Sequence, residues 1–357
     1  MNSVARYLNI LPVNSDYVRR DLSEKIISLN CWNKCILKCP YCVGNMHVPD
    51  AQQAPNILDK MGIIKFNSQV EKMISAFGAD GSRVKIVFAA ADLLLWGGYE
   101  QLFDIAVKHN CKIMILSNLH LHKRLLAIFD KYDKTYISDN INFDVSYHLG
   151  TYLERSNTNY LRDMFVNRYI KLIADRGCAV NLVVPLAPKV LADKIFENEI
   201  NKIKTYFAEG KFTVHFVELV YTLYGKRYPN SYTDRERMRV FELIHNHNST
   251  RPIPLTIENL KYNQRFFLKG ARCWFPSRYI HINMMGEIVN CDYGDILQRG
   301  KPVNIDTVTD FNTLLSPSPT FCKHDICGCS RWGNVYALNP VNVTIDKYIE
   351  FLLKINK

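Results

Sequence analysis

The chain has 357 residues, of which 48% are hydrophobic and 22% charged, with a formal net charge of +11. This composition is typical of a globular protein of one large or two ordinary domains, and it excludes a disordered or collagen-like chain. The N-terminal residues lack the ~7–15-residue apolar run of a signal peptide, and no run of ~18 apolar residues could span a membrane. We therefore expect a cytoplasmic protein without membrane contact.

The positive charge is dispersed along the chain. Its densest stretch, "YTDRERMRVF" at residues 232–241, also contains acidic residues. Such mixed charge is typical of a solvated helix face rather than of an RNA-binding patch. The sequence therefore does not favour a nucleic-acid partner, although an acidic small substrate fits the charge.

Short apolar runs alternate with longer amphipathic stretches from residue 24 to about residue 220. Strands are predicted at 24–30, 83–90, 112–118, 141–149, 179–186 and 211–219. Helices are predicted at 66–78, 98–109, 120–131, 159–176 and 192–207. This alternation favours parallel strands with right-handed helical crossovers, and the abundance of Val, Ile and Phe predicts strands covered on both faces. An α/β fold follows, as an open or closed barrel of six β/α units.

The pattern changes after residue 225. A loop leads into a helix, and residues 278–291 predict a hairpin that turns at Met285–Gly286. A cysteine-rich segment and a closing amphipathic helix near 344–355 follow. We expect a core domain at 1–225, a linker and helix at 226–270, and a small α+β domain at 271–357.

The chain has eleven cysteines, and nine of them stand in two groups. The other two, Cys111 and Cys178, we expect to be small buried side chains. In a reducing compartment, closely spaced cysteines indicate metal binding or catalysis rather than disulfides. The first group, "CWNKCILKCPYC", follows the first predicted strand. Its Cys35, Cys39 and Cys42 can hold three irons of a 4Fe–4S cluster and leave the fourth iron open. Zinc is the alternative, but a zinc site usually needs four paired ligands; Cys31 is expected to lie outside the site.

The Cys-x3-Cys-x2-Cys motif, with Tyr41 before its last cysteine, resembles the cluster motif of the radical S-adenosylmethionine (SAM) superfamily. The resemblance implies a partial (β/α)6 barrel. It also implies that the open iron chelates the amino and carboxylate groups of SAM, which is then cleaved to methionine and a 5′-deoxyadenosyl radical.

The resemblance also points to cofactor-binding residues after later strands. The family's Gly-Gly-Glu-Pro segment is replaced here by Ala90-Ala91-Asp92-Leu93, so Asp92 is expected to bind the SAM ammonium group, with a local capping role as the alternative. Ser117 and Asn118 match a polar pair placed near SAM. Strand alternation directs Ser146 and His148 to the same site, where His148 is either a SAM or substrate contact or a polar rim residue.

The second group resembles the twitch or SPASM extensions of some radical SAM enzymes. "CWFPSRYIHINMMGEIVNC" supplies Cys273 and Cys291, and "FCKHDICGCSRWG" supplies Cys322, Cys327 and Cys329. These five cysteines are fewer than two auxiliary clusters need, so the resemblance implies one auxiliary 4Fe–4S cluster held by Cys273, Cys291 and two of the other three. His324 as a ligand, and a structural zinc site, are alternatives.

Together these features predict a radical SAM enzyme that abstracts a hydrogen atom from a small polar, aminosugar-like metabolite, giving net oxidation or rearrangement. A flavodoxin or ferredoxin would supply the electron. A peptide substrate is the second choice. The alternative of another class is a non-catalytic iron–sulfur protein for electron transfer or redox sensing, in which each cluster would show four cysteines.

Overall fold

A computed structural model describes residues 24–32, 35–37, 39–41, 56–89, 92–219, 222–223, 226–228, 230–247, 272–273, 278–289, 303–315, 320–321 and 338–339. Its main feature is a nine-stranded sheet in the order β12-β11-β10-β1-β2-β3-β4-β5-β6. The first six strands are parallel: β1 (Glu24–Leu29), β2 (Arg83–Phe88), β3 (Lys112–Ser117), β4 (Ile141–Ser146), β5 (Ala179–Leu186) and β6 (Phe212–Glu218). The six predicted strands are thus confirmed.

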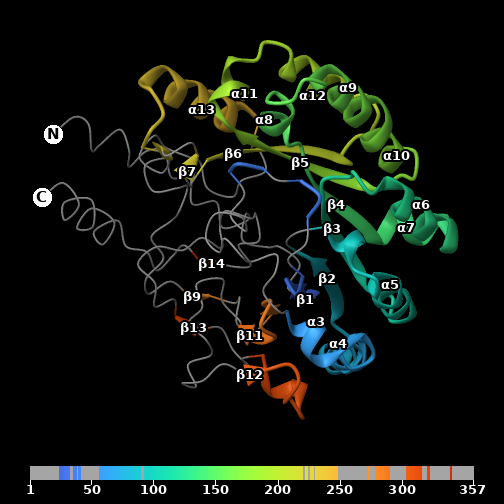
Figure 1. Ribbon diagram of the computed structural model, residues 1–357. Coiled ribbons are helices and arrows are strands. Elements are labelled where there is room, and N and C mark those ends of the chain that lie inside the picture. Colours follow the sequence, from blue (N-terminus) through green and yellow to red (C-terminus); the bar gives the residue numbers. More distant parts are fainter. Residues whose placement is uncertain are drawn as a thin grey trace, which may run out of the picture.

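Helices cover the outer side of this curved sheet (Figure 1). They are α3 (Ile57–Met61), α4 (Ile63–Gly78), α5 (Tyr99–Lys108), α6 (His122–Lys131), α7 (Lys134–Asn140), α9 (Thr158–Met164), α10 (Ile170–Ala174), α11 (Pro188–Ala192), α12 (Phe196–Lys204) and α13 (Asp234–His247). Shorter turns are η2 (Leu93–Leu95), α8 (Leu149–Tyr152), the π-helical η3 (Phe165–Tyr169) and η4 (Phe311–Thr313).

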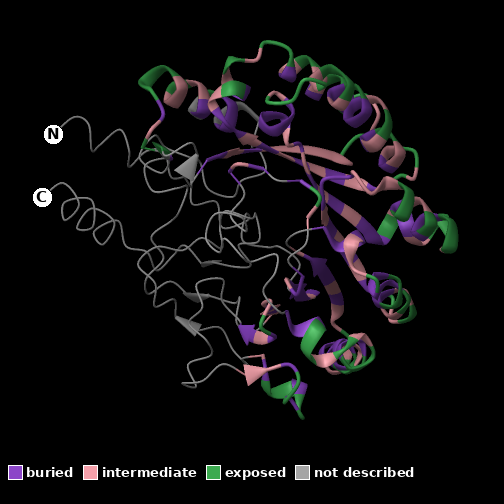
Figure 2. Ribbon diagram, in the orientation of Figure 1, coloured by how far each residue is buried: buried purple, intermediate pink, exposed green. Residues whose placement is uncertain are grey.

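The core lies between the sheet and these helices, where Figure 2 shows the buried sides of both. In α4, Phe66, Val70, Met73 and Phe77 recur at helical spacing and are at most 1% exposed. Burying an apolar side chain of this size contributes roughly 1.5–3 kcal/mol. The amphipathic pattern therefore fixes which side of the helix faces the sheet.

The two faces of the sheet differ in burial. Along β4, Ile141, Phe143 and Val145 are buried under the helices, whereas the alternate residues Asn142 and Asp144 are only half-buried. The same alternation holds in β3 and β5. We call the half-buried side the inner face. Full cover of both faces was therefore the wrong expectation here, because the inner face of the central strands contains polar and partly exposed side chains.

The predicted hairpin is confirmed, and it belongs to the main sheet. β10 (Tyr279–Ile282) pairs with β11 (Glu287–Val289), which pairs with β12 (Val303–Asn304). β10 also runs parallel to β1, with Ile26 opposite Tyr279. Gly286 has a φ of 80° at the turn, a conformation that glycine adopts without strain. In the part of the chain that the structure describes, β6 and β12 are the two edges, so this sheet is open.

Short strands complete the described chain: β7 (Thr222–Leu223) pairs with β8 (Lys226–Arg227), and β9 (Arg272–Cys273) lies between β13 (Thr320–Phe321) and β14 (Leu338–Asn339). The helix predicted near 344–355 lies outside the described residues. None of the described helices has the length and apolar character needed to cross a membrane.

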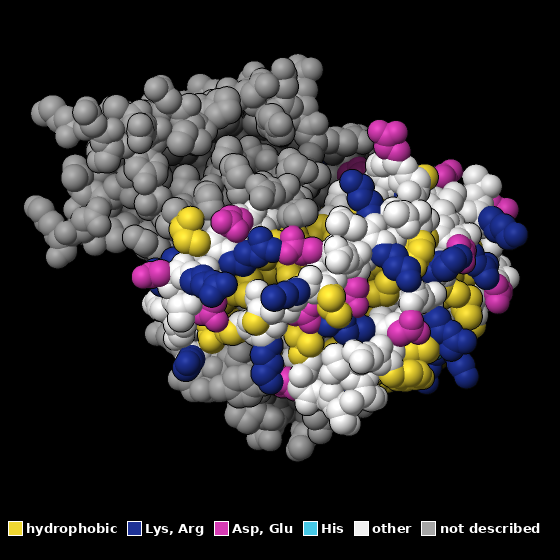
Figure 3. Space-filling view, turned by 90° about the horizontal axis from the view of Figure 1, so that it is seen from above, with side chains coloured by type: hydrophobic (Ala, Val, Ile, Leu, Met, Phe, Trp, Pro, Cys, Tyr) yellow, Lys and Arg dark blue, Asp and Glu magenta, His cyan; other side chains and the backbone are white. Residues whose placement is uncertain are grey.

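Charged side chains of both signs mix on the surface. On the face shown in Figure 3, Lys and Arg side chains are interspersed with Asp and Glu. Several form ion pairs between or within helices, such as Arg239 with Glu197 and Lys171 with Asp175. This arrangement agrees with the dispersed charge of the sequence and shows no single-sign patch on that face.

Candidate active site

The predicted site residues follow four neighbouring parallel strands at the points where these strands end. Cys35, Cys39 and Tyr41 follow β1, and Asp92 follows β2. Ser117 and Asn118 end β3, and Ser146 and His148 end β4. The carboxyl ends of parallel strands meet at one edge of a sheet, where α/β proteins build their binding sites.

Asn118 connects the cysteine loop to the end of β3. Its Nδ2 lies 3.5 Å from Cys35 Sγ, which also accepts a hydrogen bond from the Leu37 amide at 3.4 Å. Cys35 is half-buried and Cys39 is 4% exposed, and neither is in a disulfide. Two of the three predicted cluster cysteines thus lie in a loop at this edge, and Cys42 lies outside the described residues.

Cys31 differs from its neighbours in the loop. It is fully buried, and its thiol is directed at the Ile282 carbonyl oxygen at 3.7 Å. Burial raises the pKa of this thiol well above its ordinary value. Cys31 is therefore a protonated packing residue between β1 and β10, as expected for a residue outside the site.

Tyr41 and His148 are in contact. The Tyr41 hydroxyl lies 3.3 Å from His148 Nδ1 and accepts a hydrogen bond from Thr151 Oγ1 at 3.3 Å. Burial lowers the pKa of His148 to about 4, and the nearby His120 contributes in the same direction. The imidazole is therefore neutral near pH 7, and the protonated Tyr41 hydroxyl can donate to Nδ1, which places the imidazole proton on Nε2.

The turn after β3 is held by its own side chains. Ser117 Oγ accepts from the Leu119 amide at 3.0 Å, and Asn118 Oδ1 accepts from the His120 amide at 3.1 Å. Leu119 has a φ of 61°, which is strained for a residue with a Cβ. These bonds hold the turn in that conformation and so aim Asn118 at Cys35. Ser117 Oγ acts as an acceptor within this turn.

Asp92 has one occupied and one open carboxylate oxygen. Oδ1 accepts from the Leu94 amide at 3.3 Å and caps η2, so the predicted capping role is present. Oδ2 is buried and has no hydrogen-bond partner among the described residues. Burial raises the pKa of the Asp92 carboxyl to about 6, against the opposing effects of the Leu94 hydrogen bond and Arg124. A buried oxygen of this kind gains most from a cationic donor.

A buried ion-pair network supports the segment that contains His148. Arg162, on α9 and 4% exposed, donates to both oxygens of Glu199 at 2.8 and 2.7 Å and also pairs with Asp193. The Tyr147 hydroxyl donates to the same Glu199 at 2.9 Å, and its ring stacks on Phe165 at 4.4 Å. Tyr147 is therefore fixed directly before His148.

The sequence reasoning missed several residues of this site. Thr151 bonds to Tyr41, and Gly150 lies so close that an added Cβ would stand 3.1 Å from Tyr41 Cε1. His120 Nε2 lies 2.9 Å from the Tyr152 hydroxyl, and burial lowers the pKa of His120 to about 4. All follow strands β3 and β4, and this position was the available signal for them.

The second cysteine group is described only at Cys273, whose backbone lies in β9. Cys273 is opposite Thr320 of β13 and Leu338 of β14. Cys291, Cys322, Cys327 and Cys329 lie outside the described residues, as does His324. Within the described ranges, no three His, Cys, Asp or Glu residues are grouped closely enough to hold a metal ion.

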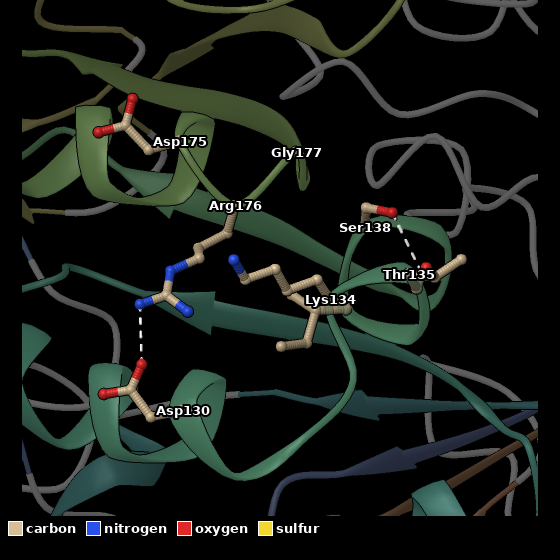
Figure 4. Close-up of a pocket in the computed structure, with 8 residues that line it drawn as sticks. Asp130, Lys134, Thr135, Ser138, Asp175, Arg176 and Gly177 are labelled. Atoms are coloured by element: carbon tan, nitrogen blue, oxygen red, sulfur yellow. Dashed lines mark hydrogen bonds and ion pairs between the residues drawn. The ribbon is translucent and has the colours of Figure 1, made fainter.

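A separate cavity of about 730 Å³ lies at the opposite end of the parallel strands, where β4 and β5 begin. Asp130, Lys134 and Arg176 line it, and Arg176 is paired with Asp130 at 2.8 Å (Figure 4). None of the predicted site residues lines this cavity. It is therefore distinct from the candidate site.

No family model matches the chain. No curated protein matches its sequence. Among solved structures, Streptococcus suis SuiB bound to S-adenosylmethionine is similar at 12% identity and a TM-score of 0.48, covering 82% of this chain and 66% of SuiB. SuiB bound to the precursor peptide SuiA is similar at 12% identity and a TM-score of 0.48, covering 82% of this chain and 65% of SuiB. BtrN in complex with AdoMet and 2-DOIA is similar at 12% identity and a TM-score of 0.31, covering 90% of this chain and 94% of BtrN. The chain thus spans just under two thirds of SuiB.

Proposed function

We propose that this protein is a radical SAM enzyme. The observation that carries the proposal is the Cys-x3-Cys-x2-Cys motif directly after β1 of a parallel sheet, with Asn118 of the β3 end in contact with Cys35. The three-thiol spacing is suited to a 4Fe–4S cluster with one open iron. The edge of the sheet supplies the surrounding polar groups.

The described residues fit such a cluster. Cys35 and Cys39 are soft thiol ligands outside any disulfide, and the amide of Asn118 offers an N–H to a ligand sulfur. Hydrogen bonds to cluster sulfurs are among the features that set the reduction potential. When bound, the cluster supplies the electron that splits SAM into methionine and a 5′-deoxyadenosyl radical.

The chain's own residues have separate tasks in this proposal. Asp92 accepts the SAM ammonium group at its open Oδ2. Asn118 orients Cys35, and the neutral His148 with Tyr41 forms a wall of the site that carries no charge. Ser146 adds a half-buried polar group at the end of β4. Together these residues bind and orient the cofactor.

A second, auxiliary 4Fe–4S cluster belongs to the proposal, in a twitch- or SPASM-like C-terminal part. Cys273 and Cys291 are two of its ligands, with two of Cys322, Cys327 and Cys329. The pairing of Cys273 with Thr320 supports it, because Thr320 precedes Cys322 by two residues. A structural zinc site is the alternative for the same thiols.

The proposed substrate is a small polar metabolite, with a peptide as the second candidate, and the reaction is a net oxidation or rearrangement in the cytoplasm. A flavodoxin or ferredoxin is the proposed electron donor. A non-catalytic iron–sulfur protein is the alternative of another class. The three-thiol motif favours the enzyme, because a cluster used only for electron transfer usually has four cysteine ligands.

The decisive experiment is anaerobic incubation of the iron-reconstituted protein with SAM and dithionite. We expect 5′-deoxyadenosine, detected by liquid chromatography, from the parent protein and from Cys31→Ala, and none from Cys35→Ala. Cys31 is the matched control because it is a nearby thiol that only packs against β10. Absence of 5′-deoxyadenosine from the parent, or its formation by Cys35→Ala at the parent rate, would contradict the proposal.

A further inference from the structure

A chain of three hydrogen-bonded side chains crosses the inner face of the sheet from β6 to β4. Thr213 Oγ1 donates to Asn181 Oδ1 at 3.0 Å, and Asn181 Nδ2 donates to Asp144 Oδ1 at 3.1 Å. The three residues are opposite one another in the strand register. All are half-buried. The chain therefore ends on a carboxylate whose hydrogen bond from the described residues comes from a neutral amide.

This chain lies directly below the candidate site. Ser146 is the next residue of β4 on the same face, and it is opposite Val183 and, through it, His215. Asn118, in contact with Cys35, follows Ser117, which is opposite Val145. Asp144 thus lies two residues, or roughly 7 Å along β4, before Ser146 and the other polar groups of the site.

The charge of Asp144 is incompletely compensated. Its hydrogen bond from Asn181 comes from a neutral amide, and among the described residues no ion pair reaches it. Burial raises the pKa of its carboxyl, and the Asn181 hydrogen bond and attraction to Lys85 oppose this effect only in part. At the beginning of β1 and β3, by contrast, Glu24 is paired directly with Lys112. A half-buried carboxylate held in place by neutral donors gains from a cation that arrives with a ligand.

We propose that Asp144 binds a protonated amine of the substrate, with Asn181 and Thr213 as positioning residues. This inference rests on the proposed function, because it places the ligand between the inner face and the cysteine loop. It narrows the substrate to molecules with a primary or secondary ammonium group, such as an aminosugar or a peptide with a lysine side chain.

The test uses matched pairs of probes that differ in one amine. Glucosamine is compared with glucose, and the tripeptide Ala-Lys-Ala with Ala-norleucine-Ala. Binding to the full-length reconstituted protein with SAM is measured by calorimetry before any reductant is added. We expect at least one amine to bind about ten- to a hundredfold more tightly than its neutral analogue. Asp144→Asn should abolish this preference, and Asp130→Asn, which removes an equal charge at the opposite edge of the sheet, should retain it.

Thr213→Val provides a second test of the proposal if Asp144→Asn does not fold. It keeps the carboxylate but removes the donor to Asn181, so the amine preference should fall several-fold with a parent-like circular dichroism spectrum. No amine preference in either pair, or an unchanged preference in Thr213→Val or in folded Asp144→Asn, would overturn the inference. Because binding is measured without SAM cleavage, a parent protein that makes no 5′-deoxyadenosine would refute the proposed function and leave this result standing.

Discussion

The Asp92 carboxylate shows how a residue in the candidate site can weaken the fold. It caps η2 with one oxygen and leaves the other buried without a partner among the described residues. A pKa raised from 3.8 to about 6 means that the folded state favours the neutral acid. The carboxyl group therefore supports folding fully below pH 3.8, and this contribution is lost as the pH rises through about 6.

Replacing Asp92 with Asn should therefore have opposite effects on stability and binding. The amide can still cap η2, so Asp92→Asn should unfold at higher urea than the parent at pH 7.5. The shift to about 6 corresponds to at most about 3 kcal/mol, and the difference should close towards pH 4. SAM affinity should fall about ten- to a hundredfold, because a charged hydrogen bond is lost. A variant less stable than the parent at pH 7.5, or with unchanged SAM affinity, would assign Asp92 to capping alone.

For single residues, the sequence predicts which of them lie near the candidate site better than it predicts the hydrogen bonds that they form. Tyr41 and His148 were both proposed for the site, because one lies in the motif and the other follows a strand. Their hydrogen bond depends on Thr151 and on the absence of a side chain at Gly150, which no local pattern reveals. The sequence did not single out Asp144, because a single acid within an apolar strand is usually an exposed residue and the sequence does not show how far that face is buried.

At the scale of elements, the hairpin turn meets α3 at very close range. A Cβ on Gly286 would stand 2.5 Å from Ile57 Cγ1 and 2.8 Å from Asn304 Oδ1, and the Ile57 amide donates to the Met284 carbonyl oxygen at 2.7 Å. The turn thus connects β10 and β11 to the helix that follows the cysteine loop. Only glycine leaves room for this contact.

Gly286→Ala should therefore cost more than its backbone conformation alone explains. Gly81 is the control: its φ is also 80°, but an added Cβ there meets nothing within 4 Å. Gly81→Ala should lose roughly 1–2 kcal/mol from the left-handed conformation. Gly286→Ala should lose that amount plus about 1–3 kcal/mol from overpacking against Ile57. Urea unfolding of both variants measures the difference in the free energy of unfolding. Equal losses of stability would show that the turn shifts away from Ile57 without an energetic cost.

The predicted strands were located well because long apolar runs specify them, whereas two predicted helices differ in detail from the observed ones. The helix expected at 159–176 is one helical segment made of α9, the π-helical η3 and α10, and that expected at 192–207 corresponds to α12, which begins at Phe196. Between the end of α11 and the start of α12, Asp193 pairs with Arg162 and accepts from the Ile195 and Phe196 amides at 2.8 and 3.1 Å. These tertiary and capping contacts fix where α12 begins, which the helical periodicity by itself does not reveal.

At the scale of the whole molecule, the last strands of the main sheet come from a part of the chain distant in sequence. The Asn30 amide donates to the Ile282 carbonyl oxygen at 2.8 Å, and Gln69 of α4 donates to the Ile305 carbonyl oxygen at 3.2 Å. The sequence suggested the hairpin but assigned it to a separate domain at 271–357. Nothing local reveals a pairing between β1 and β10, because parallel partners can lie any distance apart along the chain.

The pairing of β10 with β1 leads to a prediction about truncated chains. Deleting residues 271–357 would make β1 an edge strand with unpaired backbone groups. It would also remove Ile280, Ile282, Ile288 and Ile305, each at most 1% exposed. At roughly 1.5–3 kcal/mol for each side chain, this loss approaches the ~5–15 kcal/mol of a typical domain. We expect this chain to aggregate on gel filtration. Deleting only residues 316–357 keeps β10 to β12 and η4, so that chain should elute as a folded species with parent-like circular dichroism. A monomeric, cooperatively unfolding chain of residues 1–270 would show instead that the first six strands form an independent domain.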